Sequence, residues 1–414
     1  MFTTTNVHAE DFIIQESNYG AHNYHPLPVV LSRGKGVHVW DVEGKKYYDF
    51  LSAYSAVNQG HCHPRITKAL VEQAANLTLT SRAFYNDQLG PYYEFMTSLF
   101  GYEKLLPVNT GVEAVETGLK LARKWGYEVK GVPHGKAKII TASGNFHGRT
   151  LAAVTMSTDE DTRENFGPFL PGIVTVPYND LHAMELACED PNVVGVLLEP
   201  IQGEAGVIVP DDQYMIKTAE LCKARNILFM ADEVQTGIAR TGKMLACDHL
   251  NIRPDILILG KALSGGVLPV SAVLADDDIM LCIKPGQHGS TFGGNPLACA
   301  VATEAMQVVL DEDLASNAEM LGRIFIEEMS KFQKTNSLVS AVRGRGLLTA
   351  VEINDSPDSE TAWNICLSMA DKGLLAKPTH GNIIRFAPPL VMTPSQLSDC
   401  IDIICTTLTE FSIS

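Results

Sequence analysis

The stretch Ile256–Gly266 reads ILILGKALSGG, and it decides the fold. Its opening apolar run has the length of a strand and follows the turn-forming pair Pro254-Asp255, so we expect a buried strand that ends at Gly260. Lys261 then stands at the carboxyl end of that strand, the edge at which open α/β sheets bind their ligands. On its own, this lysine is either an amine kept for chemistry or an ordinary cation that reaches solvent.

A second apolar run, Ile227–Ala231, ends in a carboxylate at Asp232. Asp232 and Lys261 lie about one strand–helix–strand unit apart, so neighbouring parallel strands can present both side chains to one cleft. Pyridoxal phosphate needs such a pair, because an amine forms the Schiff base and an acid keeps the ring nitrogen protonated. The two stretches together therefore point to Lys261 and Asp232 as catalytic residues of a pyridoxal phosphate site.

Short apolar runs alternate with amphipathic segments from about residue 54 to residue 269. The expected strands are Ala137–Thr141, Ile173–Val176, Val193–Leu198, Ile227–Ala231, Ile256–Leu259 and Val270–Ala275. The segments Val112–Trp125 and Tyr214–Arg225 are expected helices. This alternation predicts an α/β fold with a mostly parallel central sheet and helices on both faces.

The two ends of the chain follow other patterns. Residues 37–50 predict a hairpin with its turn at Glu43-Gly44. The C-terminal expectations are helices over Pro296–Leu310, Asn317–Phe332 and Pro394–Phe411, strands at Val342–Ile353 and Ile383–Ala387, and a turn at Gly344–Gly346. We therefore expect an N-terminal segment (1–54), a large cofactor-binding domain (55–309) and a small α+β C-terminal domain (310–414).

Composition narrows the classes of function. A hydrophobic fraction of 45% over 414 residues is enough for a large buried core. The net charge of −16 argues against nucleic acid and anionic membranes as partners. The nine cysteines are scattered without a CxxC pair and are expected to be reduced thiols. Met1–Asp11 lacks an apolar signal core and arginines, and no apolar run is long enough to span a membrane, so we expect a cytoplasmic protein.

Two stretches are suited to binding a phosphate group. Thr110 can cap the helix that follows it, and Gly111 lets backbone N–H groups approach an anion at the helix N-terminus. The alternative is a capped helix that binds nothing. The loop Gly286–Pro296 offers the hydroxyls of Ser290 and Thr291, although it can equally be a flexible connection.

With these pieces in place, the sequence resembles the class III aminotransferases, pyridoxal phosphate enzymes of fold type I, over essentially its whole length. The motifs that carry the resemblance are Asn109–Gly111 (NTG), Gly144–Thr150 (GNFHGRT), Glu199–Gly206 (EPIQGEAG), Ala231–Gly237 (ADEVQTG), Gly260–Leu263 (GKAL) and Gly289–Pro296 (GSTFGGNP). Their joint occurrence in this order is specific. The resemblance implies pyridoxal 5′-phosphate as the cofactor and a homodimer whose subunits share their active sites.

The resemblance also assigns roles around the cofactor. It makes Lys261 the Schiff-base lysine and proton shuttle, and Asp232 the partner of the ring nitrogen. The other cofactor contacts it implies are Gly111 and Val112 at the phosphate, Phe146 and Val234 on the ring faces, Gln235 at the phenolic oxygen, and Thr291 with Ser290 reaching the phosphate from the partner subunit.

Within the family, Tyr19–Pro28 and Leu375–Gly381 are similar to members that act on ornithine. This similarity implies transfer of the δ-amino group of L-ornithine to 2-oxoglutarate, giving glutamate 5-semialdehyde and glutamate. Arg149 is suited to the substrate carboxylate through a bidentate fork. Tyr24 is suited to the α-amino group, and Tyr54 to lining the pocket or packing at an interface.

Arg385 is the candidate cation for the α-carboxylate of 2-oxoglutarate. Left unpaired, it would also attract the α-carboxylate of ornithine. The family's solution is a glutamate that pairs with the arginine when ornithine binds and swings away for the keto acid, and Glu204 matches it. Glu199 is expected to position its neighbours, with a purely structural role as the alternative.

Other functions remain open at this stage. An acetylornithine, succinylornithine or 4-aminobutyrate aminotransferase would share most of these motifs, and a catalytically silent scaffold with the same fold is the non-enzyme alternative. We expect no metal site. His61-Cys62-His63 lacks a second ligand pair and is better explained by a turn before a helix, and Asp276–Asp278 by a solvated helix start.

Overall fold

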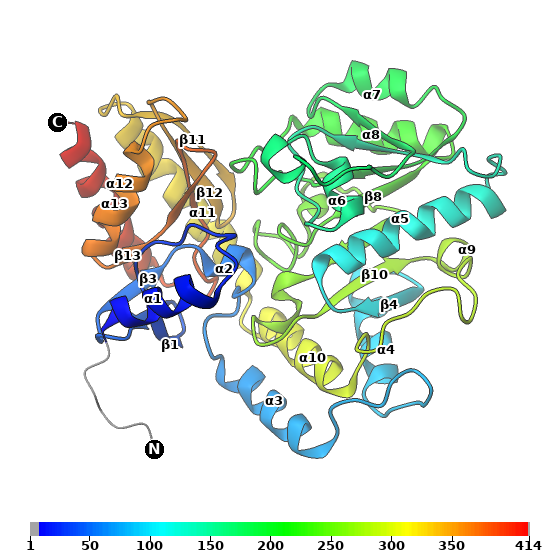
Figure 1. The fold of residues 1–414 in the computed structure, drawn as a ribbon, viewed down its shortest axis with the longest axis horizontal. Helices are drawn as coiled ribbons and strands as arrows, with labels where there is room; N and C mark the ends of the chain where they lie inside the picture. The colour runs from blue at the N-terminus through cyan, green and yellow to red at the C-terminus, as the bar shows by residue number, and fades with distance from the viewer. Residues whose placement is uncertain (1–7, 413–414) are drawn as a thin grey trace.

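The computed structural model describes residues 8–412. Residues 1–7, which make up much of the Met1–Asp11 stretch, and residues 413–414 lie outside the described part. The described chain forms a large part around a seven-stranded sheet and a smaller part built from both ends of the sequence (Figure 1). Among the described residues, none of the helices combines the length and apolar character needed to cross a bilayer.

The seven-stranded sheet carries the predicted α/β architecture. Its order is β4 (Lys104–Val108), β10 (Ser271–Ala275), β9 (Ile256–Leu259), β8 (Leu228–Asp232), β7 (Val193–Leu198), β5 (Lys138–Ala142) and β6 (Ile173–Val176). The run from β9 to β6 is parallel, whereas β10 is antiparallel to both of its neighbours. Every residue of β7, β8, β9 and β10 is buried, as expected for strands covered on both faces.

Helices cover both faces because alternate strand residues point to opposite sides. One face packs α5 (Gly111–Glu128), α6 (Leu151–Met156) and α9 (Asp277–Met280). The other face packs α7 (Leu181–Ala187) and α8 (Asp212–Ala224) at one end, and α3 (Pro64–Asn76), α4 (Leu89–Phe100) and α10 (Pro296–Asp311) at the other. Short 3₁₀ turns η1 (Glu160–Thr162), η2 (Ala246–Leu250) and η3 (Lys261–Ser264) lie in the connections.

The smaller part contains two four-stranded sheets. One is antiparallel, in the order β11 (Val339–Arg345), β12 (Leu348–Ile353), β15 (Ile383–Phe386) and β14 (Lys377–Thr379). The other joins β1 (Leu31–Lys35), β2 (His38–Asp41) and β3 (Lys46–Asp49) to β13 (Leu374–Leu375). The helices of this part are α11 (Leu314–Gln333), α12 (Thr361–Asp371) and α13 (Pro394–Ser412), and the N-terminal α1 (Ala9–Tyr19) and α2 (Ser52–Ser55) lie nearby.

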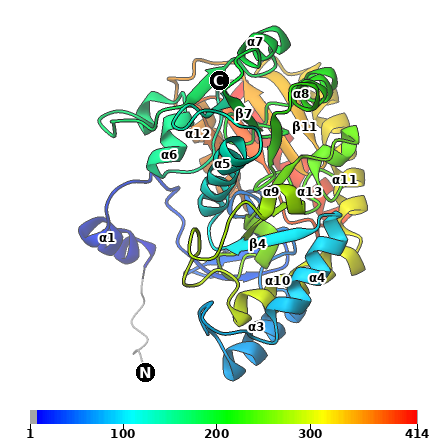
Figure 2. The same cartoon turned by 90° about the vertical axis from the view of Figure 1, so that its right-hand side faces the viewer.

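Most predicted elements are present with ends within three residues, and several features differ or were not expected. The expected turn at Gly344–Gly346 is narrower, since Gly344 and Arg345 belong to β11 and the reversal falls at Gly346-Leu347. Strands β1, β4, β13 and β14 were not among the expected strands. Helix α1 was not expected either; none of its residues is buried, and Figure 2 shows it standing away from the body of the protein.

Candidate active site

Lys261 lies directly after β9, as the sequence predicts. The preceding Gly260 has no side chain, and a Cβ there would press on Val234 at 3.2 Å and on the Gly111 backbone at 3.4 Å. Lys261 itself adopts a positive φ of 44° and begins the 3₁₀ turn η3. Burial lowers the pKa of its amine, although the carboxylates of Asp232, Glu204 and Glu199 act in the opposite direction. The neutral amine is therefore easier to reach than in a solvent-exposed lysine.

Asp232 ends the neighbouring strand β8 and is almost fully buried. One carboxylate oxygen, Oδ2, lies 2.7 Å from His147 Nδ1, and Oδ1 accepts a hydrogen bond from the Val234 N–H at 3.1 Å. For the His147 ring, burial lowers the pKa, but the contact with Asp232 outweighs it and the pKa is raised overall. The Asp232 carboxylate is thus held in one orientation by partners on two segments.

A cavity of about 180 Å³ joins the two strand ends. Its walls bring together residues from five separate stretches of sequence: Gly111, Val112, Val115, Phe146, His147, Gly148, Glu199, Asp232, Val234, Gln235 and Lys261. Seven of these are the predicted cofactor contacts, and Lys261 and Asp232 are among them. The Asp232–Lys261 pair expected from strand spacing is therefore found in one cleft.

Pyridoxal phosphate fits the chemistry of this cavity. At one side, α5 begins at Gly111 behind Thr110, whose hydroxyl accepts from the Glu113 N–H at 3.3 Å in a capping box, so the first N–H groups of the helix face the cavity end. A Cβ at Gly111 would lie 2.8 Å from Val234 Cγ1, and one at Gly148 would overlap Val112. Only glycine leaves the space, as expected where a backbone must approach a ligand.

Other lining residues of the cavity supply polar groups for a ring. His147 Nε2 is buried without a hydrogen-bond partner. Gln235 Nε2 donates to the Tyr54 carbonyl at 3.3 Å, and a Cβ at Gly203 would overlap the Gln235 amide oxygen. The Gln235 amide therefore occupies space that only a glycine at position 203 leaves open, and one hydrogen bond orients it.

Glu199 directly follows β7 and accepts a hydrogen bond from the Phe146 N–H at 2.8 Å. Burial raises its pKa to about 7, with Asp232 adding to the effect and His147 opposing it. The predicted positioning role is consistent with this contact, because Glu199 holds the backbone of Phe146 at the cavity wall.

Arg385 and Glu204 form a bidentate ion pair beside the cavity. Arg385 lies on β15 and is 5% exposed. Its Nη1 and Nη2 lie 2.8 and 3.2 Å from the two Glu204 oxygens, and its Nε is buried without a partner. The guanidinium carbon is 5.2 Å from the centre of the Tyr54 ring. The structure thus brings together three residues predicted to bind substrate.

Arg149 and Tyr24 are more exposed than Arg385. Arg149 is exposed, lies 5.2 Å from the Phe146 ring centre, and lines a second cavity of about 500 Å³ together with Glu204, Thr379 and His380. Because Phe146, His147 and Gly148 line both cavities, the two are adjacent. Tyr24 is 76% exposed. Burial raises the pKa of the Tyr54 hydroxyl and Tyr24 adds to this effect, so Tyr24 lies near Tyr54 and the second cavity, which together form the entrance to the site.

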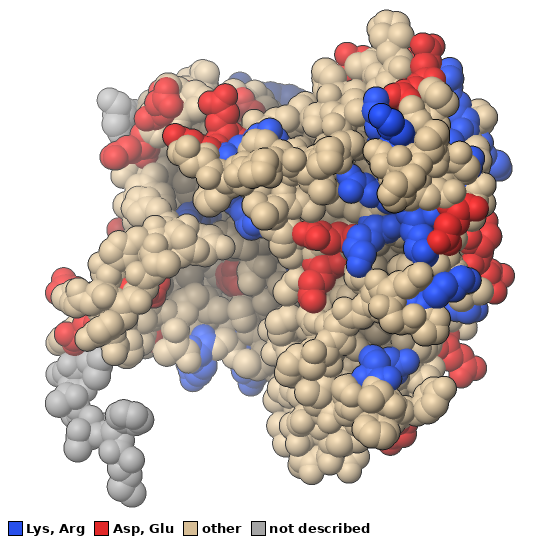
Figure 3. Space-filling model, turned by 45° about the vertical axis from the view of Figure 1, so that its right-hand side comes forward, with Lys and Arg blue, Asp and Glu red and all other residues tan. Residues whose placement is uncertain are grey.

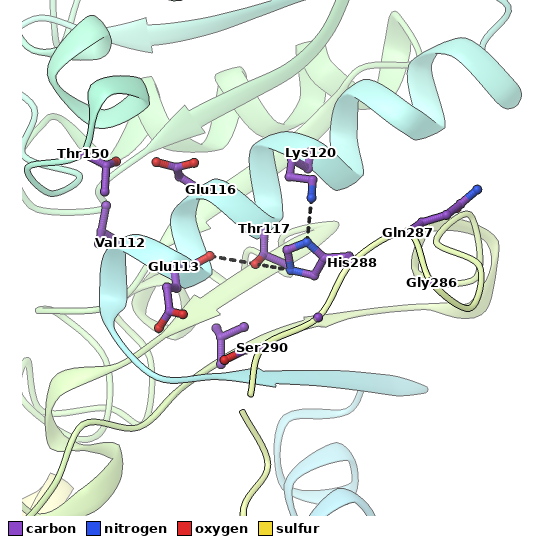
Figure 4. A pocket seen from close by; sticks show the side chains of 12 residues that line it. Val112, Glu113, Glu116, Thr117, Lys120, Thr150, Gly286, Gln287, His288 and Ser290 are labelled. Carbon is purple, nitrogen blue, oxygen red and sulfur yellow. Dashed lines mark hydrogen bonds between the residues drawn. The ribbon is translucent and has the colours of Figure 1, made fainter. Parts of the chain in front are cut away.

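Ser290 and Thr291 do not line the cofactor cavity of their own chain. Ser290 Oγ accepts from Asn109 Nδ2 at 2.8 Å and lines a further pocket of about 530 Å³, in which His288 lies between Thr117 and Lys120 (Figure 4). Thr291 is exposed. Their predicted contact with the phosphate of a partner subunit remains a prediction.

The two histidines of the His61-Cys62-His63 motif contact different carboxylates. His61 pairs with Asp49 at 2.7 Å, whereas His63 pairs with Glu312 at 2.9 Å. No group of three possible ligands is present among residues 8–412.

On the face drawn in Figure 3, acidic and basic side chains are interspersed around a hollow between the two parts of the protein.

Sequence reasoning did not include His147 among the site residues. The signal was its position between Phe146 and Gly148 in the GNFHGRT motif, but nothing local ties it to Asp232, which is 85 positions away. Only the fold brings the two strand ends together.

Comparisons with known proteins agree with this geometry. The family model for class III aminotransferases matches residues 19–408. The chain is 60% identical to a mitochondrial ornithine aminotransferase of Rattus norvegicus, covering 96% of this chain and 90% of that protein. It is 53% identical to an ornithine aminotransferase of Plasmodium falciparum, covering 97% of both.

Solved structures show the same similarity. The ornithine aminotransferase of Toxoplasma gondii superposes with a TM-score of 0.96 at 48% identity, covering 98% of this chain and 96% of that one. Another structure of that protein shows partial occupancy of pyridoxal phosphate at its active site. An acetylornithine aminotransferase from Elizabethkingia anophelis has a TM-score of 0.90 at 59% identity, covering 98% and 100%. With the family model spanning nearly all of its length and the predicted cavity in place, the chain belongs to the class III aminotransferases.

Proposed function

We propose that this protein is a pyridoxal phosphate-dependent ornithine aminotransferase. It transfers the δ-amino group of L-ornithine to 2-oxoglutarate, giving glutamate 5-semialdehyde and glutamate in two half-reactions at one site. The observation that carries the proposal is the Lys261–Asp232 cavity lying directly beside the bidentate Glu204–Arg385 pair. The names of the rat, malarial and Toxoplasma relatives support the choice of ornithine.

When bound, pyridoxal phosphate supplies an aldehyde that takes up the amino group and a ring that stores the electron pair of a broken C–H bond. The N–H groups of Gly111 and Val112 hold its phosphate, and Phe146 and Val234 contact its ring. Asp232, fixed by His147, holds a proton on the ring nitrogen.

Lys261 moves the proton. Burial lowers the pKa of its amine and so favours the neutral form, which can take a proton from the reacting carbon of the substrate and would return it to the carbon that was the aldehyde of the cofactor. The 3₁₀ turn that begins at Lys261 fixes its backbone at the edge of the cavity.

The Glu204–Arg385 pair decides which amine reacts. In the first half-reaction the pair stays closed, so Arg385 is unavailable and ornithine enters with its terminal amine first. Arg149 then holds the α-carboxylate and Tyr24 the α-amino group at the entrance, with Tyr54 lining the passage. In the second half-reaction Glu204 swings away and Arg385 takes the α-carboxylate of 2-oxoglutarate.

The proposal includes a homodimer in which Ser290 and Thr291 of each subunit reach the other's phosphate site. We also propose that the chain divides into an N-terminal segment (1–54), a large cofactor-binding domain (55–309) and a small C-terminal domain (310–414). We propose a cytoplasmic location without nucleic acid or membrane partners. Nine unpaired cysteines support a reducing compartment, and the mitochondrial names of several relatives make the mitochondrion the alternative. Cell fractionation distinguishes the two.

A substrate panel tests the function. Purified protein with pyridoxal phosphate is assayed with L-ornithine, N-acetylornithine, N-succinylornithine and 4-aminobutyrate, each with 2-oxoglutarate. We expect ornithine to give the highest kcat/KM and glutamate 5-semialdehyde as its product. Comparable or better turnover of any other donor contradicts the proposal.

A second candidate, acetylornithine aminotransferase, is favoured by the 59% identity to the Elizabethkingia anophelis protein of that name. The two substrates differ at the α-nitrogen, which is charged in ornithine and an uncharged amide in the acetylated form. A Tyr24→Phe variant separates the candidates, because loss of the hydroxyl weakens binding of ornithine but not of N-acetylornithine.

A further inference from the structure

Four consecutive residues beside the substrate passage form a left-handed turn without glycine. Ser52, Ala53, Tyr54 and Ser55 have φ values of 47°, 47°, 59° and 71°. Residues with a Cβ avoid this region, because the Cβ crowds the following carbonyl. The hydroxyls of Ser52 and Ser55 are buried without hydrogen-bond partners, so the serine side chains do not compensate for the strain. Other contacts must hold the turn in place.

Asp49 is placed to do this. Its Oδ1 accepts hydrogen bonds from the Leu51 and Ser52 N–H groups, each at 2.9 Å, at the start of the turn. Its Oδ2 lies 2.7 Å from His61 Nε2. His61 is anchored in turn, since its backbone exchanges two hydrogen bonds with Gly36, at 2.8 and 2.9 Å. The pair is mostly buried, with side-chain exposures of 11% for Asp49 and 22% for His61.

The turn presents Tyr54 to the site in two ways. The Tyr54 ring packs against the Arg385 guanidinium, and the Tyr54 carbonyl accepts from Gln235. The ring therefore contacts the cation of the substrate pair, whereas the backbone contacts a residue of the cofactor cavity. Both contacts depend on the unusual backbone conformation.

We propose that Asp49 and His61 are positioning residues that hold the left-handed turn, so that Tyr54 meets Arg385 and Gln235. Neither residue touches the cavity, and both act through Tyr54. The inference rests on the proposed function, since its readouts include the ornithine and 2-oxoglutarate half-reactions.

Asp41 offers a matched control on the neighbouring strand. Its Oδ1 accepts from the Glu43 and Lys45 N–H groups at 3.0 and 2.8 Å, and its Oδ2 accepts from the Tyr47 hydroxyl at 2.6 Å. Counted over the whole residue, Asp41 is 9% exposed and Asp49 is 8% exposed, so the two are buried equally. These contacts stay within the β2–β3 hairpin, so Asp41→Ala removes an equivalent carboxylate without loosening Tyr54.

The test is a double-mutant cycle on the holoenzyme at saturating pyridoxal phosphate. We expect Asp49→Ala to lower kcat/KM for 2-oxoglutarate roughly tenfold to a hundredfold, as misplacement by about 1 Å can. In a Tyr54→Ala background the same change should cost no more than about twofold, because the ring it positions is gone. Asp41→Ala should have similar small effects in both backgrounds. Independent, multiplicative losses for Asp49→Ala and Tyr54→Ala, or equal losses for Asp49→Ala and Asp41→Ala, overturn the inference.

Two further measurements do not depend on turnover. Titration of cofactor-free protein should show several-fold weaker pyridoxal phosphate binding for Asp49→Ala but not for Tyr54→Ala, which keeps its backbone carbonyl. Thermal midpoints identify variants that fail to fold, and His61→Gln, which keeps a donor near the Nε2 position, then carries the test in their place. His61→Gln should retain near-wild-type kcat/KM and His61→Ala should not; equal behaviour of the two removes His61 from the proposal. If wild-type protein fails to use ornithine, the proposed function fails instead.

Discussion

The cofactor cavity and the substrate entrance are built on opposite principles. The cavity is formed by the ends of adjacent parallel strands, and its key groups, Asp232 and His147, are buried and fixed by short hydrogen bonds. The entrance is assembled from segments far apart in the sequence, from Tyr24 to Arg385, and several of its side chains are exposed. The comparison suggests that the chemistry is preorganised, whereas substrate selection depends on side chains with room to move.

Lys261→Ala should cause the largest loss, because it removes the proton-transferring amine from the rigid region. We expect turnover to fall by roughly a thousandfold or more while the fold is kept. Steady-state kinetics together with circular dichroism check this. The exposed Lys243→Ala is the control and should keep full activity. Near-normal turnover of Lys261→Ala would break the contrast between the two regions.

Arg385→Lys should come next, since it keeps a positive charge but loses the two-pronged contact with Glu204. We expect the second half-reaction to slow by about a hundredfold and the first by much less. Single-turnover measurements with each substrate separate the two. Arg65→Lys, which alters the ion pairs of an arginine on α3 with Glu304 and Asp311, should leave both half-reactions nearly unchanged.

Glu204→Ala sharpens the claim of a moving gate. Without its partner, Arg385 is open to α-carboxylates in both half-reactions, so the preference for the terminal amine should fall by about tenfold. Product analysis, which separates terminal from α-amino transfer, measures this preference. An unchanged preference would remove Glu204 from the account, and Glu304→Ala, which removes a partner of Arg65, serves as its control.

Glu199→Gln should give the smallest effect, on stability. Burial raises the pKa of Glu199 to about 7, so the folded state binds this proton more tightly than the unfolded chain does. The resulting stabilisation is complete below the unfolded pKa and is lost as the pH rises through about 7. Glu199→Gln has no proton to lose, so its thermal midpoint relative to wild type should rise by a few degrees between about pH 5 and pH 8.

That shift is measured by differential scanning calorimetry on cofactor-free protein. The exposed Glu185→Gln provides a baseline that should not change with pH in this way. A midpoint difference independent of pH contradicts the assigned ionisation.

The same contrast explains what could be predicted from sequence. Lys261 and Asp232 could be predicted from the sequence because each stands at the end of an apolar run, and strand ends meet at one edge of a parallel sheet. The antiparallel direction of β10 could not be predicted, because an apolar run does not indicate the direction of a strand. The His147–Asp232 contact depends on two strands far apart in the chain.

The left-handed turn could not be predicted from the sequence either. The residues Ser52–Ser55 read SAYS, and none of them signals a positive φ. Their conformation follows from contacts with Asp49 and the surrounding core. The pairing of Arg385 with Glu204 was expected only because the motifs resemble a known family, not because local pattern required it.

Covalent mapping of the cofactor tests the central claim most directly. Holoenzyme is treated with borohydride, which fixes pyridoxal phosphate to the amine that holds it, and the digested peptides are sequenced by mass spectrometry. The account predicts the modification on Lys261 alone, with Asp232→Ala weakening cofactor binding but leaving the attachment site unchanged. Modification of a different lysine, or none at all in colour-bearing protein, would contradict it.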